Sequence, residues 1–204
     1  WGVWLTDFKN HLLPSSIKNY EDQNTDSHES THLINSYLNS IYGEYQKNYC
    51  LYVGNDKAVI IKQPDVKISQ IADMIPEKLR KSRYQMYMID QAKSWNDAPI
   101  YLLDEWIAYT NGAKTSVELI DKHVLPSKGS STDEIYSVLQ FNVYALYVCM
   151  ATQKHDPSYN NKQLFEFMAW NCANSMKTYN EGVMYNYYNW DNDEYLEELR
   201  TGDD

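Results

Sequence analysis

The chain has 204 residues, of which 43% are hydrophobic, so it is long and apolar enough to bury a sizeable core as one globular domain. Its formal net charge is −10 and it has no lysine- or arginine-rich run, which excludes the basic surface that nucleic acids and anionic membranes require. No segment approaches the roughly 18 consecutive apolar residues of a membrane-spanning helix, so we expect no membrane insertion.

The N-terminal part of the chain predicts one long helix after a polar loop. A first segment, 3–13, ends at Pro14, and the polar stretch 15–26 is typical of a loop. We expect the helix to begin near Asp26 and to stop at Gly43.

The middle of the chain predicts a hairpin followed by helices. Two β-rich runs, 49–53 and 58–62, flank the turn sequence GNDK, which is typical of a β-hairpin. Beyond the hairpin the periodicity is helical. Pro76 interrupts one helix, and Pro99 stands at the expected first turn of the next.

The C-terminal half is expected to be helical. A loop around Pro126 precedes two long amphipathic helices, over 132–153 and 161–180. The acidic tail, about 191–204, predicts a short helix that frays at its end. Because the sequence shows no internal repeat and no linker, we expect one domain over 1–204, of the α+β class and mostly helical.

The stretch "HESTH", residues 28–32, is the one place where the sequence indicates catalytic chemistry. On a helix, His28 and His32 lie one above the other, so both imidazoles can bind a single metal ion. Glu29 projects beside them, where its carboxylate can take a proton from a metal-bound water that attacks a carbonyl. In the alternative interpretation, Asp26 and Glu29 form a capping-box-like pair and the histidines face water.

The helical periodicity separates the two histidines from an apolar stripe. One side of the helix gathers Leu33, Ile34, Tyr37, Leu38 and Ile41. The opposite, polar side carries His28, His32, Asn35 and Asn39. We therefore expect the apolar side to be buried and the histidines to line a cleft or to face solvent.

A catalytic zinc ion usually has three protein ligands and a water, so a third ligand is expected elsewhere in the chain. The metzincin pattern would need glycine at position 35 and histidine at position 38, where the chain has Asn35 and Leu38. The apolar stretch 99–112 instead holds two acids, Asp104 and Glu105. A buried carboxylate needs a partner, and a metal ion would supply one.

We favour Glu105 as the third metal ligand, because on a helix it shares a stripe with small residues that allow a close approach to the first helix. Asp104 is the alternative ligand, or else the acceptor that orients a ligand histidine. His123 and His155, with the neighbouring Asp156, are fallback ligands. An acidic pair on a half-exposed surface helix would explain both acids without a metal.

The segments "HESTH" and "DEWIAY" resemble the gluzincin branch of the zincin zinc metallopeptidases. The resemblance implies a zincin-like active-site helix beside a small sheet, with Zn²⁺ bound by His28, His32 and Glu105. It also implies that Glu29 is the general base and that an edge strand of the hairpin binds extended peptide substrate.

The same resemblance implies an oxyanion stabiliser, for which Tyr109 is our candidate. Tyr109 lies one turn after Glu105, at a position where thermolysin-like enzymes carry an acid. The other candidates are Tyr84, Tyr87 and Tyr101. A packing role is the alternative for each of these tyrosines.

The resulting hypothesis is a zinc-dependent metallopeptidase that acts on a peptide or protein substrate. The alternatives are a catalytically inactive zincin-like binding module, a metal-dependent amidase with a non-protein substrate, and a helical structural protein without metal. The chain opens at Trp1, from which we expect a processed or trimmed chain that is secreted or extracytoplasmic. Cys50, Cys149 and Cys172 allow either one disulfide, between Cys149 and Cys172, or none. The sequence leaves the oligomeric state open.

Overall fold

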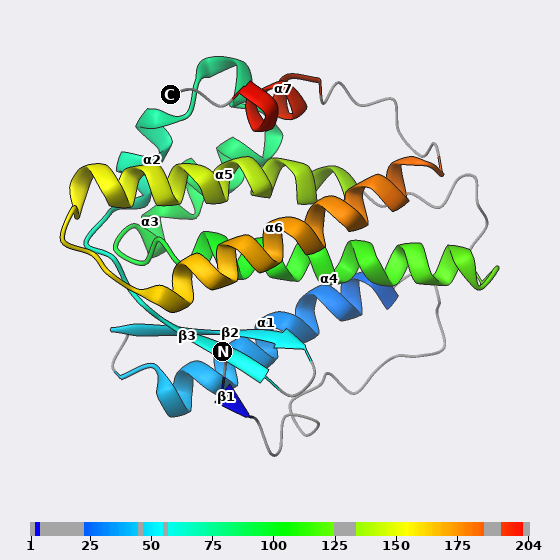
Figure 1. The fold of residues 1–204 in the computed structure, drawn as a ribbon, viewed down its shortest axis with the longest axis horizontal. Coiled ribbons are helices and arrows are strands. Elements are labelled where there is room, and N and C mark those ends of the chain that lie inside the picture. The colour runs from blue at the N-terminus through cyan, green and yellow to red at the C-terminus, as the bar shows by residue number, and fades with distance from the viewer. Residues whose placement is uncertain are drawn as a thin grey trace.

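A small antiparallel sheet lies against a group of long helices in the computed structural model (Figure 1). The structure describes residues 3–4, 23–44, 47–54, 57–124, 134–185 and 193–201. The sheet consists of β1 (Val3–Trp4), β2 (Asn48–Gly54) and β3 (Lys57–Lys62). Its strand order is β1-β3-β2, and both strand pairs are antiparallel.

Helices make up most of the described chain. They are α1 (Gln23–Tyr42), α2 (Ile68–Met74), the short 3₁₀ helix η3 (Glu77–Leu79), the π-helix η4 (Tyr84–Asp90), α3 (Ala92–Trp95), α4 (Tyr101–Asp121), α5 (Glu134–His155), α6 (Lys162–Val183) and α7 (Asp193–Thr201). The prediction of an α+β, mostly helical fold is confirmed.

Most of the predicted elements are found where the sequence patterns locate them. Strands β2 and β3 form the predicted hairpin, and α2 ends before Pro76. Pro99 lies two residues before α4, and α5 and α6 are the two long C-terminal helices. Segment 5–22, the loop around Pro126 and the end of the acidic tail lie outside the described residues.

Helix α4 is the central element of the fold, since it packs against α1, α5 and α6. Every residue of α4 from Tyr101 to Thr110 is buried. The core of the described chain contains five aromatic side chains with essentially no exposure, from Trp106, Phe141, Tyr144, Phe167 and Tyr195. Because α4 is buried on all sides in this stretch, its acidic pair is not the half-exposed surface pair of the alternative interpretation.

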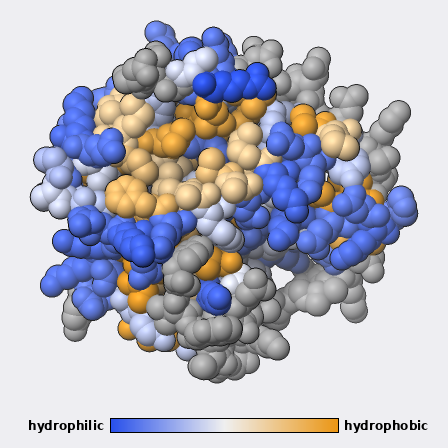
Figure 2. Space-filling view, viewed as in Figure 1, coloured by the Kyte–Doolittle hydropathy of each residue, from blue (hydrophilic) through white to orange (hydrophobic). Residues whose placement is uncertain are grey.

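Helix α5 is long and apolar enough to cross a membrane by length and composition, and 83% of its apolar window is buried inside the fold. The core helix of a protein that does not span a membrane can have the same length and apolar composition. Figure 2 shows a hydrophobic area over α5 and α6 on the viewed face. The exposed large apolar side chains of these helices include Leu146, Met150 and Phe165.

The buried face of α1 differs from the face that hydrophobic periodicity predicts. His28, Asn35 and Leu38 are buried, whereas Leu33 and Ile41 are 40% and 51% exposed. The expectation that the whole apolar stripe is buried, with the histidine side opposite it, is therefore wrong. Polar groups of α4 and β2 hydrogen-bond the polar stripe of α1, which offsets the cost of burying it.

The start of α1 also differs from the prediction. The helix begins at Gln23, so residues 23–26 are helical and Asp26 lies in the first turn. Asp26 is thus not at the N-cap position, and the capping-box explanation of Glu29 is wrong.

Two asparagine side chains of α1 hydrogen-bond the outer edge of β2. The Asn39 side-chain oxygen accepts a hydrogen bond from the backbone N–H of Cys50 at 2.7 Å. The Asn35 side-chain oxygen accepts one from the backbone N–H of Tyr52, also at 2.7 Å. These two N–H groups are consequently not available to an added strand.

Two leucine truncations on α1 test which face is buried. Leu38 is 1% exposed in a small core with Ile34, Cys50 and Ala58, so Leu38→Ala is expected to lower the free energy of unfolding by about 2–5 kcal/mol. Leu33→Ala removes the same atoms from an exposed site and is expected to change the free energy of unfolding by less than about 0.5 kcal/mol. Urea unfolding of both variants measures the difference, and equal losses would contradict the assigned face.

Candidate metal centre

Helices α1 and α4 bring together three side chains that the sequence predicts as metal ligands. The Nε2 atoms of His28 and His32 are 3.1 Å apart, and Oε2 of Glu105 lies 3.8 Å from the first and 3.5 Å from the second. Zinc bonds of about 2.0–2.1 Å in tetrahedral geometry separate ligand atoms by about 3.3 Å. The triangle therefore has the dimensions of three corners of a zinc site.

The donor set and its burial also fit a metal ion. Oε2 of Glu105 is buried and makes no hydrogen bond within the described residues, while Oε1 accepts one from the Tyr101 hydroxyl at 2.6 Å. A buried carboxylate oxygen without a donor is costly, and a cation between it and the two histidines would offset that cost. No other trio of histidine, cysteine or carboxylate groups converges in this way in the described part of the chain.

Asp104 holds the surroundings of this trio in place. Its Oδ1 lies 3.1 Å from Nδ1 of His32 and accepts a hydrogen bond from Asn35 at 2.6 Å. Its Oδ2 accepts a hydrogen bond from the Tyr49 hydroxyl at 2.7 Å. The interaction with Nδ1 directs Nε2 of His32 towards Glu105, which is the arrangement of a carboxylate that orients a ligand histidine. Asp104 thus occupies the supporting position rather than that of the third ligand.

The protonation states of the two histidines differ in the metal-free protein. Burial and the charge of His32 together lower the pKa of His28 to about 4, so His28 is neutral. Burial also opposes the charged form of His32, but its hydrogen bond with Asp104 and the negative charges of Asp104 and Glu105 raise its pKa to about 10. Burial likewise opposes ionisation of Glu105, yet the proton on His32 holds the pKa of Glu105 below its usual value.

The His32 proton therefore serves the same purpose that a metal ion would serve. It places one positive charge among three atoms that would otherwise leave a buried carboxylate unpaired. Binding of a divalent cation would displace that proton, because a ligand histidine must be neutral.

Tyr109 packs against the trio instead of directing its hydroxyl at a bound group. Its ring contacts His28 edge-on, with centroids 4.5 Å apart, and its hydroxyl is hydrogen-bonded to Tyr87 at 2.8 Å. The Arg83 guanidinium lies over the same ring, 4.9 Å from the centroid. Tyr101 holds Oε1 of Glu105, so it positions the acid.

The remaining predicted residues belong neither to the trio nor to the lining of the adjacent cavity. Glu29 follows His28 on α1 but is exposed, and it is not part of the lining of the adjacent cavity. His123 and His155 are exposed at the ends of α4 and α5, and Asp156 accepts a hydrogen bond from the backbone of Asp65. The structure does not bring these fallback ligands to the site.

The cysteines do not supply a reactive group. Cys50, Cys149 and Cys172 are all free thiols, so of the two sequence alternatives the structure has the one without a disulfide. Burial raises the pKa of Cys50 to about 12 and that of Cys149 to about 11, which disfavours the nucleophilic thiolate.

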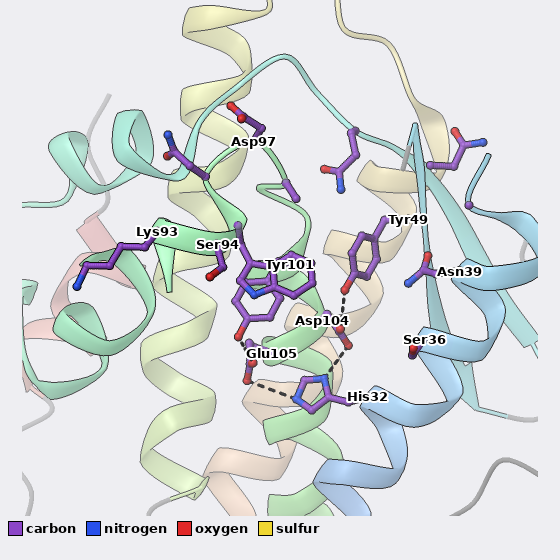
Figure 3. Close-up of a pocket in the computed structure, with 16 residues that line it drawn as sticks. His32, Ser36, Asn39, Tyr49, Lys93, Ser94, Asp97, Tyr101, Asp104 and Glu105 are labelled. Atoms are coloured by element: carbon purple, nitrogen blue, oxygen red, sulfur yellow. Dashed lines mark hydrogen bonds and ion pairs between the residues drawn. The ribbon is translucent and has the colours of Figure 1, made fainter. Parts of the chain in front are cut away.

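A cavity of about 680 Å³ opens beside the trio and gives it access to solvent. Figure 3 shows His32 with Asp104 and Glu105 at one end, and with Tyr49 and Tyr101 on either side. The His32 side chain is 23% exposed, compared with 7% for Glu105. The volume lies within the range of about 300–1,000 Å³ typical of small-molecule sites.

Sequence reasoning missed two residues of this site, Asn35 and Tyr49. Both bind Asp104, from α1 and β2 respectively. Asn35 lies on the polar side of α1 with His28 and His32, one turn before Asn39, and this position could have identified it from the sequence. Tyr49 is one of 19 tyrosines and no local pattern distinguishes it.

Comparisons with known proteins add no relatives. No protein-family model matches the chain, and neither a curated protein nor a solved structure shows significant similarity to it.

Metal analysis tests the assignment of the trio. Protein purified without added metal is expected to hold about one zinc ion per chain, and His28→Ala is expected to lose it, because two ligands bind a metal much more weakly than three. His155→Ala, which removes an exposed histidine, should retain it. A wild-type protein that holds no metal, takes up none, and has the same melting temperature with and without chelator would overturn the metal site.

Asp104 offers a graded test of the support around His32. Asp104→Asn removes the negative acceptor and is expected to weaken zinc binding by about 10–100-fold. Tyr49→Phe removes only one hydrogen bond to Asp104 and should cause a smaller loss. Competition titration with a chromophoric chelator measures both affinities, and zinc binding unaltered in Asp104→Asn would contradict the supporting role.

Proposed function

We propose that this protein is a zinc-dependent hydrolase of peptide or related amide bonds. His28, His32 and Glu105 bind Zn²⁺, and Glu29 is the general base. The observation that carries the proposal is the convergence of two histidine nitrogens and one buried carboxylate oxygen, 3.1–3.8 Å apart, where the oxygen accepts no hydrogen bond from the described residues.

Zinc supplies Lewis acidity at such a site and lowers the pKa of a coordinated water to about 7. The chain supplies the remaining parts of the mechanism. Asp104 keeps the proton of His32 on Nδ1 so that Nε2 faces Glu105, and Tyr101 holds the second oxygen of Glu105. In this proposal Glu29 would take the proton of the attacking water and deliver it to the leaving amine.

The edges of the described sheet favour a compact substrate over an extended peptide. Asn39 and Asn35 occupy two N–H groups of β2, and the side-chain oxygen of Gln163 from α6 accepts a hydrogen bond from Ile60 of β3. Substrate binding by strand addition needs such groups to be free. This observation supports the amidase candidate, which acts on a non-protein or short amide, over a peptidase with extended substrates.

A second candidate function is a zincin-like binding module without turnover. The exposure of Glu29 and its absence from the cavity lining favour this candidate, because a general base must reach the reacting water. The two candidates share the metal and differ in the need for Glu29.

Glu29→Gln separates the two candidates. In the hydrolase, loss of the general base is expected to lower kcat by about 10²–10⁴-fold while zinc content is unchanged. Glu118→Gln removes an exposed carboxylate of α4 and is the matched control. The measurement is the release of free amine from a panel of short peptides and N-acylated amides.

The outcomes of this experiment are distinct. Equal turnover in Glu29→Gln and wild type would show that Glu29 is not the base. A zinc-loaded wild-type protein without turnover on the whole panel would favour the binding module.

A further inference from the structure

Besides His32 and the charged residues Lys93, Asp97, Asp104 and Glu105, the lining of the cavity beside the trio includes six uncharged polar side chains. They are Ser36, Asn39, Asn48, Gln63, Ser94 and Asn96. Such walls suit a ligand that has many hydrogen-bonding groups and no charge, because a charged ligand would require a compensating charge.

Three of these side chains have a fixed orientation. The oxygens of Asn39, Gln63 and Asn96 accept hydrogen bonds from backbone N–H groups at 2.7, 3.3 and 3.0 Å, donated by Cys50, Ile100 and Ser69 respectively. Each carboxamide must therefore present its NH₂ group as the remaining donor. Figure 3 shows the Asn39 side chain projecting towards the cavity.

An aromatic stack forms a further part of the wall. The Trp95 and Tyr101 rings are nearly parallel, with centroids 4.9 Å apart and planes 7° apart. Tyr101 is 8% exposed and Trp95 is 38% exposed, so Trp95 is the outer ring. Because Tyr101 covers one face of the indole, the exposed surface of Trp95 consists of its other face and its edges.

The charged residues of the lining disfavour an anionic ligand. Lys93 is paired with Asp90 at 3.1 Å, and in Figure 3 its side chain extends away from the cavity. At the inner end, His32 is flanked by two carboxylates, Asp104 and Glu105. Among the described residues of the lining, no cation is thus left to bind a carboxylate or phosphate, and Asp97 is paired with Lys67 at 3.6 Å.

We propose that this cavity binds a saccharide ring, and, resting on the proposed hydrolase, that the substrate is an N-acylated amino sugar. A sugar is uncharged, presents many hydroxyl acceptors to amide donors, and has an apolar ring face that packs on an indole. In the reaction, water adds to the acyl carbon, the C–N bond breaks, and the products are a carboxylate and the protonated amine of the sugar.

Calorimetric titration with N,N′-diacetylchitobiose tests the binding site. Wild-type protein is expected to bind this sugar, and a capped dialanine with equivalent amide groups is expected to bind at least about tenfold more weakly. The titration is repeated with His155→Ala, which changes an exposed residue outside the cavity lining, and sugar binding should persist there.

Asparagine-to-aspartate variants test the donors without removing the oxygen that holds the backbone. Asn39→Asp and Asn96→Asp each replace an NH₂ donor by an acceptor and are expected to weaken sugar binding by about tenfold. Trp95→Ala should weaken it similarly, and Trp95→Phe less. Asn160→Asp, at an exposed site that does not line the cavity, controls for the added charge.

The outcomes separate this proposal from the hydrolase. Absence of sugar binding, equal binding of the capped dipeptide, or full affinity in Asn39→Asp and Asn96→Asp would overturn the saccharide site. A protein that binds the sugar but holds no zinc would overturn the hydrolase and leave the cavity assignment standing. Zinc binding with peptide turnover but no sugar binding would overturn the saccharide site and support the hydrolase.

Discussion

The burial of the Asp104 carboxylate is the constraint on which the site depends. The residue is 5% exposed and its neighbours on the helix, apart from Glu105, are apolar, so its charge needs donors from neighbouring elements. His32 and Asn35 supply them from α1, and Tyr49 supplies one from β2. A single acid thereby fixes the relative positions of two helices and a strand, and with them the direction of the His32 ring.

The same constraint explains why α1 buries a polar face. Asn35 has no exposed surface, and it donates to Asp104 while accepting from the backbone of Tyr52. Thr31 is buried too, where it accepts a hydrogen bond from Asn111 of α4. With these polar groups paired, packing the histidine side inward costs little, and Leu33 is left at the surface.

Local patterns in the sequence predict a large part of this arrangement. The four-residue spacing of His28 and His32, the hairpin, and the acidic pair in an apolar helix all depend on neighbours in the chain. The buried face of α1 does not depend on neighbours in the chain. It depends on hydrogen-bond partners on α4 and β2, which hydrophobic periodicity does not take into account. The small residues on the Glu105 stripe, which include Gly112, are expected from the sequence to let α4 approach α1. A side chain at Gly112 would instead meet the Glu134 carboxylate of α5 at 2.6 Å, so Gly112 makes room for α5.

Hydrogen bonds already order the site in the metal-free protein, so a metal ion would change little beyond the three ligand side chains. The main core consists of hydrophobic side chains from β2, β3, α2, η3, η4, α4, α5, α6 and α7. A core of this size distinguishes the protein from a zinc finger, whose folding depends on its metal. What remains unsatisfied is local: Oε2 of Glu105 and Nδ1 of His28 are buried and lack hydrogen-bond partners among the described residues. Of these two atoms, only the carboxylate oxygen faces both histidines, so a cation bound there would take over the pairing that the His32 proton provides in the metal-free protein.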